Sequence, residues 1–214
     1  MDDLTQNWSR LTLTDREGLG CRLTTEDSLE DFSIIVKFFM KRALNIDVIE
    51  RTFNPLWRII SNEPWSFDKH LVVIRKYEKE TPVADVKFGR VSFWVQIHGI
   101  PPLYMTMEAA LKISKVIGVV SRPKEFKEMD GGNFLRLKVS LDLTLPLCRG
   151  HLISPENGKQ IWISFKYELL PNLYYWCGCL TYDDKDCEIW IDSERTLKPE
   201  DRQFGSGLRP PTFI

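Results

Sequence analysis

The stretch FLRLKVSLDL, which runs from Phe134 to Leu143, decides the fold of this chain. Apolar and polar residues alternate along its whole length, and such alternation places the two kinds of side chain on opposite faces of a β-strand. The segment is therefore predicted to be a strand with one buried and one open face. The predicted buried residues are Leu135, Leu137, Val139, Leu141 and Leu143, and the predicted outward residues are Arg136, Lys138, Ser140 and Asp142.

Several other segments show the same two-residue period or are rich in β-branched and aromatic residues, so they are also predicted strands. The polar face of VSFWVQIHG carries Trp94, Gln96 and His98, and that of KQIWISFKYE carries Lys166. These further strands are predicted over Val91–Gly99, Lys159–Glu168, Leu71–Tyr77 and Phe32–Arg42, and the segment Asn62–His70 is predicted to be a turn.

Two helices are predicted from capping residues and helical spacing. Asn45 is a preferred N-cap residue for the first helix, and Pro55 is expected to end it. Thr106 can cap the second helix, and Gly118 is expected to close it in the left-handed conformation. The predicted apolar faces consist of Ile46, Ile49 and Phe53 in the first helix and of Met107, Ala110, Leu111, Ser114 and Ile117 in the second.

The order of these elements predicts an α+β fold class, with an antiparallel sheet and helices on one face. Residues 1–30 are predicted to form an N-terminal extension, with a strand or hairpin around Leu19–Leu23, and residues 31–170 to form the α+β domain. Residues 171–190 make up a loop-rich segment that contains cysteines. The tail over residues 191–214 is polar and rich in glycine and proline, so it is expected to be disordered.

The composition limits the classes of function. The chain has 214 residues and a formal net charge of −1, which excludes a strongly basic nucleic-acid-binding protein. Any such binding would therefore need a local basic surface. No apolar run reaches the length of a membrane span, and the N-terminal residues show no secretory signal. Five cysteines, an odd number, then indicate free thiols in a reducing compartment, nuclear or cytoplasmic.

The segment YYWCGCLTYDDKDC, from Tyr174 to Cys187, places cysteines among aromatic and acidic residues. Cysteine thiolates are zinc ligands, and a structural zinc site needs four cysteine or histidine donors in a tetrahedron. Only Cys177, Cys179 and Cys187 supply sulfur in this stretch. The segment is therefore a metal site, the remains of one, or a turn with reduced thiols.

Four blocks of the sequence together resemble a known family. They are EPWSFDKHLVVIRKY, VSFWVQIHGIP, FLRLKVSLDLTLPLCRG and IWISFKYELLPNLYYWCGCL. The family is the domain of unknown function that precedes a zinc knuckle in plant LINE-type retrotransposon proteins and their domesticated relatives. The resemblance implies nucleic-acid binding and a ferredoxin-like or RRM-like fold. It also implies an incomplete first half, because the segments on either side of residues 58–62 are joined almost directly.

The knuckle of that family has the pattern C-x2-C-x4-H-x4-C. Its second and fourth ligand positions fall on Cys177 and Cys187, whereas the first and third fall on Tyr174 and Tyr182. Neutral phenols are not usual zinc ligands, so the resemblance implies a degenerate knuckle that has lost its zinc, and no cofactor is expected. The alternative is a non-standard site in which Cys179 supplies a third sulfur and Asp183, Asp184 or Asp186 supplies an oxygen.

Basic and aromatic residues are candidates for contacts with nucleic acid. Lysine and arginine side chains contact phosphates, and aromatic rings stack on unpaired bases. The alternative is that the basic residues lie on a solvated sheet face and that the aromatic residues cover the end of the sheet. The basic candidates are Arg75, Lys76, Arg136, Lys138 and Lys166, and the stacking candidates are Tyr174, Tyr175 and Trp176.

No sequence motif supports an enzyme. His70, His98 and His151 lie far apart in the chain, and it has neither a phosphate-binding glycine loop nor a zinc-protease motif. The leading interpretation is a non-enzymatic, retroelement-derived module that binds single-stranded nucleic acid, RNA in particular. The alternative is a structural or protein-interaction remnant that binds neither nucleic acid nor zinc. Self-association through exposed sheet edges is a further expectation, and a membrane partner is not expected.

Overall fold

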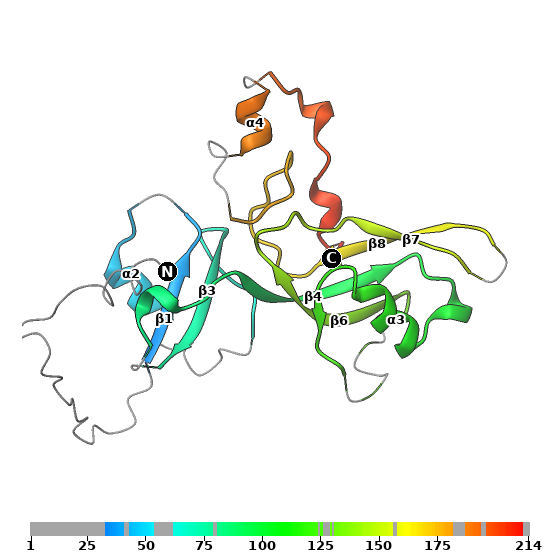
Figure 1. Ribbon diagram of the computed structural model, residues 1–214, viewed down its shortest axis with the longest axis horizontal. Coiled ribbons are helices and arrows are strands. Elements are labelled where there is room, and N and C mark those ends of the chain that lie inside the picture. Colours follow the sequence, from blue (N-terminus) through cyan, green and yellow to red (C-terminus); the bar gives the residue numbers. More distant parts are fainter. Residues whose placement is uncertain are drawn as a thin grey trace, which may run out of the picture. The chain divides into compact units, whose positions relative to one another are not determined.

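A computed structural model describes residues 33–40, 43–53, 62–78, 81–123, 125, 129, 131–155, 158–181, 187–193 and 196–211. The chain divides into two units, Met1–Phe32 and Ser33–Ile214, and all described elements belong to the second unit. The strand or hairpin predicted around Leu19–Leu23 and residues 58–61 of the predicted junction lie outside the described residues. The second unit contains two antiparallel sheets and short helices, which confirms the α+β class (Figure 1).

The larger sheet consists of β4 (Arg90–His98), β5 (Val119–Val120), β6 (Phe134–Asp142), β7 (Gly150–Ile153) and β8 (Ile161–Tyr167). Its strand order is β5-β6-β4-β8-β7, and all neighbours are antiparallel. β4 and β6 pair along their whole length, with Phe93 opposite Val139 and Trp94 opposite Lys138. Since residues opposite each other point to the same face, this register gathers the apolar residues of both strands on one side.

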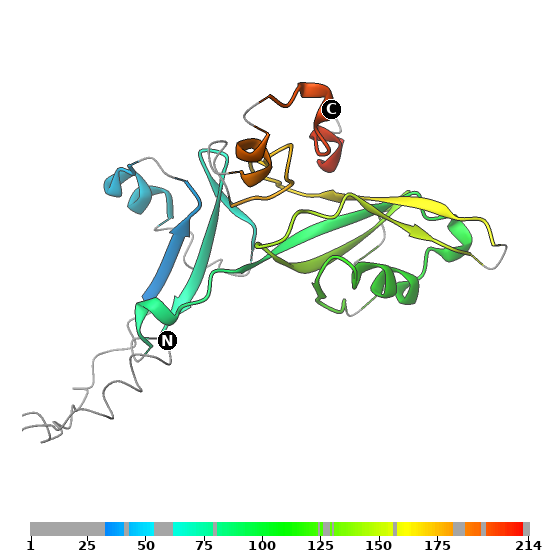
Figure 2. The same cartoon turned by 45° about the horizontal axis from the view of Figure 1, so that its top comes forward.

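The inward face of the five-stranded sheet forms the main core. Leu135, Val139 and Phe165 are fully or almost fully buried there, and the inward residues predicted for β6 are confirmed. Helix α3 (Met107–Ser114) packs on this face, with Ala110 and Ile113 in the same core (Figure 2). The opposite face of the sheet is therefore the one that carries polar and aromatic side chains.

The smaller sheet contains β1 (Ser33–Phe38), β2 (Trp65–Phe67) and β3 (His70–Tyr77), in the order β1-β3-β2. The central strand β3 is buried on both sides. Leu71 and Val73 belong to the main core, whereas Val72 and Ile74 pack with apolar residues of β1, β2 and the first helix. The antiparallel sheet expected from the sequence is thus two sheets, and β3 connects their apolar layers.

The first two helices begin where the sequence predicts. Asn45 accepts hydrogen bonds from backbone N–H groups in the first turn of α2 (Ile46–Phe53), and Thr106 does the same for α3. Ile49 packs against the smaller sheet, but Ile46 is 69% exposed, contrary to the prediction of a shared apolar face. The remaining helical segments are η2 (Val83–Asp85), η3 (Pro102–Tyr104), α4 (Glu188–Asp192), η5 (Pro199–Asp201) and η6 (Ser206–Leu208).

Two further local predictions were wrong. The segment predicted to be a turn contains strand β2, and only Asp68 and Lys69 form the tight turn to β3, with φ values of 47° and 64°. Gly118 is not in the left-handed conformation. It is needed because a Cβ atom at this position would collide with the backbone carbonyl of Ser140.

The tail also differs from the expectation of disorder. Leu208 is 4% exposed and lies in the main core. Arg209 Nη2 donates a hydrogen bond to the Pro171 carbonyl oxygen at 2.8 Å, and the ring of Phe204 lies against Gly178. Polar composition alone predicted disorder, but one buried leucine and one arginine hold residues 204–209 on the domain.

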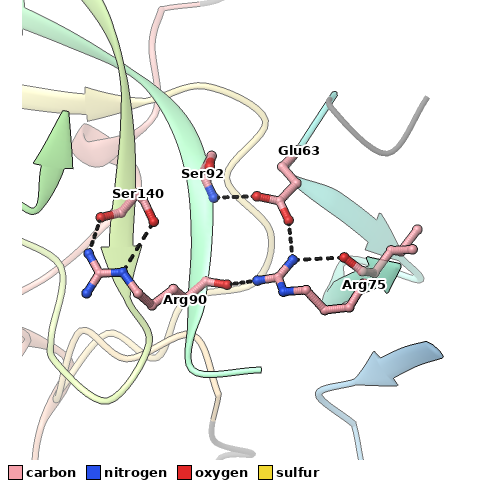
Figure 3. A network of polar contacts seen from close by, with 6 residues as sticks. Glu63, Arg75, Arg90, Ser92 and Ser140 are labelled. Carbon is pink, nitrogen blue, oxygen red and sulfur yellow. Dashed lines mark hydrogen bonds and ion pairs between the residues drawn. The ribbon is translucent and has the colours of Figure 1, made fainter. Parts of the chain in front are cut away.

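A polar junction links the two sheets (Figure 3). The Glu63 carboxylate accepts hydrogen bonds from Arg75 Nη1 at 2.6 Å and from the Ser92 backbone N–H at 2.8 Å. Arg75 also donates to the backbone carbonyl of Arg90, whose own side chain donates to Ser140 on β6. We refer to Glu63, Arg75, Arg90 and Ser92 as the polar junction.

Candidate nucleic-acid interface

One face of the five-stranded sheet collects aromatic and basic side chains from three adjacent strands. The register places Trp94 opposite Lys138, Gln96 opposite both Arg136 and Lys166, and His98 opposite both Phe134 and Ser164. All these side chains point away from the core that α3 covers. We define the outer sheet face by Trp94, Gln96, His98, Phe134, Arg136, Lys138, Trp162, Ser164 and Lys166.

An arginine stacks on an aromatic ring at the centre of this face. The Arg136 guanidinium lies 3.9 Å from the centroid of the Trp94 ring. It is held there by two parallel hydrogen bonds to Glu168, from Nε at 2.8 Å and from Nη2 at 2.7 Å. A paired and stacked guanidinium has a fixed orientation, so Trp94 and Arg136 form a rigid floor rather than mobile side chains.

The same carboxylate organises a chain of side-chain hydrogen bonds. Gln96 Nε2 donates to Glu168 Oε1 at 2.8 Å, and Gln96 Oε1 lies 3.0 Å from His98 Nε2. These bonds explain why Gln96 is only 6% exposed although it lies on the outer sheet face. The His98 ring in turn lies 4.9 Å from the ring of Phe134, with 30° between their planes.

Trp162 provides a second aromatic surface on β8. Its side chain is 54% exposed, and its indole lies against Gly150 on the neighbouring strand. Leu152, directly opposite Trp162, is also exposed. Trp162 and Leu152 are therefore two exposed apolar side chains that lie next to each other at this edge of the sheet.

Two titratable groups at the outer sheet face, Glu168 and His98, have shifted pKa values. Burial raises the pKa of Glu168, but hydrogen bonds from Arg136 and Gln96 outweigh this effect, so its pKa lies below the usual value. Burial, and then the nearby charge of Lys166, lower the pKa of His98. At neutral pH the face therefore combines an ionised Glu168, a neutral His98 and three basic side chains.

The structure separates the five basic candidates into two groups. Arg136, Lys138 and Lys166 lie together on the outer sheet face. Arg75 belongs instead to the polar junction, where Glu63 and two backbone carbonyls take up its donors. Lys76 is exposed on the smaller sheet, opposite Ile34. A binding surface on the larger sheet would therefore not include Arg75 or Lys76.

The three stacking candidates lie near the tail, away from these strands in the chain. Tyr174 is 7% exposed, and its ring lies 5.6 Å from that of Trp176. The Trp176 ring also contacts Trp190 at 5.2 Å and the Arg202 guanidinium at 4.5 Å. Tyr175 accepts a hydrogen bond from Arg209 at its hydroxyl oxygen. These contacts engage the three rings with other side chains of the C-terminal segment, and base stacking by them stays a prediction.

The three cysteines of the C-terminal segment come together. Cys177, Cys179 and Cys187 are free thiols, and Cys177 is hydrogen-bonded to both of the others. The hydrogen bond to Cys179 and burial raise the pKa of Cys177, whereas the same bond lowers the pKa of Cys179. Burial raises the pKa of Cys187. Cys177 and Cys179 are two residues apart in the sequence, and their thiols are in direct contact.

These residues do not make a four-donor zinc site within the described part of the chain. No group of three or more His, Cys, Asp or Glu residues there is arranged to hold a metal ion. Tyr174, at the first ligand position of the knuckle pattern, is packed against Trp176 and offers a phenol. Tyr182, Asp183, Asp184 and Asp186 lie outside the described residues.

The sequence indicated the basic residues of this face as binding candidates, but it did not indicate the aromatic ones as such. The alternation in VSFWVQIHG placed Trp94 and His98 outward, yet it gave no reason to join them with Phe134 or Trp162. The sequence does contain a signal for an aromatic surface, because each of three predicted strands has an outward-facing aromatic residue. Without the strand register, however, nothing in the sequence showed that these rings share one surface.

Comparisons with known proteins agree with the location of the cysteine segment. The CCHC-type zinc knuckle family matches residues 141–189, which suggests a role in binding nucleic acid or zinc. The chain is 25% identical over 134 residues to the uncharacterized protein At4g02000 of Arabidopsis thaliana. That alignment covers 62% of this chain and 42% of the relative, so the chain spans less than half of the relative's length. No solved structure gives a significant match.

The helices of the described residues give no sign of membrane insertion. Each of them is too short or too polar to cross a bilayer.

Proposed function

We propose that this chain is a non-enzymatic module that binds single-stranded nucleic acid through the outer sheet face. The observation that carries the proposal is the grouping of Trp94, His98, Phe134 and Trp162 with three basic side chains on one surface. Exposed rings on a sheet stack on unpaired bases, and nearby lysines contact the phosphates. The match to the zinc knuckle family supports the same class of ligand.

RNA is the proposed ligand, and a retroelement protein the proposed origin. Both rest on the four sequence blocks that resemble the retrotransposon family. We further propose that the chain works without a resident zinc ion, because two of the four ligand positions carry tyrosine. Nucleic acid would then bind to the sheet and not to a metal-stabilised knuckle.

Filter binding with single-stranded RNA at two salt concentrations tests the proposal. The net charge of −1 and the few lysines predict affinity that is modest and falls as salt rises. Replacing Trp162 with alanine should weaken binding by about 1–3 kcal/mol, the value of one base–aromatic stack. Replacing Lys166 with alanine should weaken binding and reduce the salt dependence by about one charge.

Lys112→Ala is the matched control. Lys112 is an exposed lysine on α3, which packs on the opposite face of the sheet, so the same change of charge there should leave binding unaltered. Equal losses in Lys112→Ala and Lys166→Ala would show non-specific attraction. Absence of salt-sensitive binding by the unaltered protein would remove the proposal.

A specific observation favours a second function, protein interaction. β7 is an edge strand, and both its Leu152 and the opposite Trp162 on β8 are more than half exposed. An edge with exposed apolar side chains can pair with another chain. Sedimentation velocity over a range of concentrations checks this, and a purely monomeric protein that binds RNA would leave only the first function.

A further inference from the structure

The hydrogen bonds on the outer sheet face fix which nitrogen of His98 carries a proton. Arg136 holds the Glu168 carboxylate through two hydrogen bonds. The Arg136 bonds and the bond from Gln96 outweigh the effect of burial and keep the pKa of Glu168 below its usual value. At neutral pH its carboxylate is therefore ionised and can only accept hydrogen bonds.

The orientation of Gln96 follows from that charge. Because Glu168 only accepts, the amide NH2 group of Gln96 must face it, as the 2.8 Å contact from Nε2 to Oε1 shows. The amide oxygen then faces His98 Nε2 at 3.0 Å. An amide oxygen has no proton to give, so His98 must donate from Nε2.

The remaining ring nitrogen of His98 is consequently an acceptor. Burial and the charge of Lys166 keep the pKa of His98 below its usual value, so the ring is neutral at pH 7 and carries one N–H. Among the described residues, no partner contacts His98 Nδ1. The ring is partly exposed, and Phe134 supports it at 4.9 Å. A rigid, neutral acceptor thus lies on the proposed binding surface.

We propose that His98 Nδ1 makes the outer sheet face select bases that present an amino group, so that cytosine is bound in preference to uracil. The proposal rests on the proposed function and gives it a substrate class. Cytosine carries an amino donor at N4, whereas uracil carries a carbonyl acceptor at O4 in the same place. An acceptor that faces position 4 of the base pairs with the cytosine amino group and repels the uracil carbonyl, while stacking and phosphate contacts are common to both.

Glu168, Gln96 and Arg136 act as positioning residues in this scheme. Only His98 Nδ1 contacts the amino group of the base. The three positioning residues hold His98 in one tautomer and one orientation. The selectivity therefore depends on side chains on three different strands or strand ends.

The test compares oligocytidylate with oligouridylate of equal length in the same buffer at pH 7.5. The unaltered protein should bind the cytidine polymer about three- to tenfold more tightly, the value of one net hydrogen bond. His98→Phe keeps an aromatic ring beside Phe134 but removes the acceptor. It should lose the preference for cytidine and bind the two polymers with similar affinity.

A second variant and a direct measurement separate selectivity from folding. Gln96→Met removes the amide that orients His98 while retaining an unbranched side chain of similar length, and it should reduce the ratio of the two affinities. Nitrogen chemical shifts of the His98 ring in the unaltered protein should show the Nε2–H tautomer. The opposite tautomer would overturn the proposal without any binding data.

The possible results distinguish failure of the proposed function from failure of the proposed selectivity. If the unaltered protein binds neither polymer, the proposed function fails and the selectivity fails with it. If it binds both polymers equally, or if His98→Phe retains the preference for cytidine, only the selectivity is overturned. A ratio unchanged in Gln96→Met would remove the positioning role of the hydrogen-bond chain.

Discussion

Gly150 shows how one small residue shapes the outer sheet face. It lies on edge strand β7 opposite Ser164, and a Cβ atom there would collide with the Trp162 indole and with the backbone carbonyl of Ile163. The absence of a side chain therefore lets the indole lie on the neighbouring strand. Gly150 is the first residue of β7, and a larger residue at this position would have to displace the ring.

Replacing Gly150 with alanine should lower the free energy of unfolding by about 1–3 kcal/mol, the usual cost of overpacking. Urea unfolding followed by circular dichroism measures this change. Gly89→Ala is the matched control, because no atom lies within 4 Å of a Cβ built at Gly89. A Gly150→Ala protein as stable as the control would show that the indole moves aside freely.

The polar junction connects the two sheets, and its ion pair differs from the other ion pair near it. Arg75 and Glu63 are largely covered, with side chains 27% and 12% exposed, and each makes further hydrogen bonds across the junction. The Arg90–Asp142 pair differs, since its atoms are 3.9 Å apart and both side chains are more than a third exposed. The first pair should therefore contribute to stability and the second should contribute little.

Glu63→Ala should reduce the free energy of unfolding by about 2–3 kcal/mol, because it leaves Arg75 covered and unpaired. Asp142→Asn removes a charge from the exposed pair but keeps an oxygen that can accept from Thr144, so it should leave stability almost unchanged. Chemical unfolding of both variants checks the difference. Equal effects would mean that the junction is no more than a surface ion pair.

The elements that the sequence predicts well are those with a local signal. Alternation in Phe134–Leu143 and the caps at Asn45 and Thr106 depend on neighbouring residues, and the structure confirms them. Strand β2 was missed because three residues next to a turn carry too little periodicity. The ordered tail was missed because the burial of Leu208 depends on residues far away in the chain.

The candidate site was predictable only in part, for the same reason. Outward-facing basic residues were visible in single strands, but the neighbourhood of Trp94, His98 and Trp162 depends on pairing between β4 and β8. The proximity of Cys177 to Cys187 likewise depends on the path of the chain between them. Contacts across strands and loops are decided by register, which one sequence does not reveal.

At the scale of the whole molecule, the main question is whether folding depends on a metal ion. The main core consists of apolar residues from β3, β4, β6 and β8, together with Leu208 from the tail and residues of the adjoining loops and α3. A small knuckle, by contrast, folds only when its metal is bound. The C-terminal segment here is held by Arg209 and by the stacked rings around Trp176.

Protein purified without chelator should accordingly contain much less than one zinc ion per chain, and its melting temperature should not change when a chelator is added. Elemental analysis and thermal unfolding measure the two quantities. Stoichiometric zinc, with a lower melting temperature after chelation, would contradict the proposed loss of the site. Cys177→Ser would then identify whether the clustered thiols hold the ion.

The half-exposed position of Trp162 has a practical consequence for detection. Among the seven tryptophans of the chain, this indole lies open on the proposed binding surface, whereas Trp94 on the same face is covered by a guanidinium. A nucleobase that stacks on Trp162 would quench its emission and shield it from dissolved acrylamide. The fluorescence of Trp162 can therefore report the binding of nucleic acid without an added label.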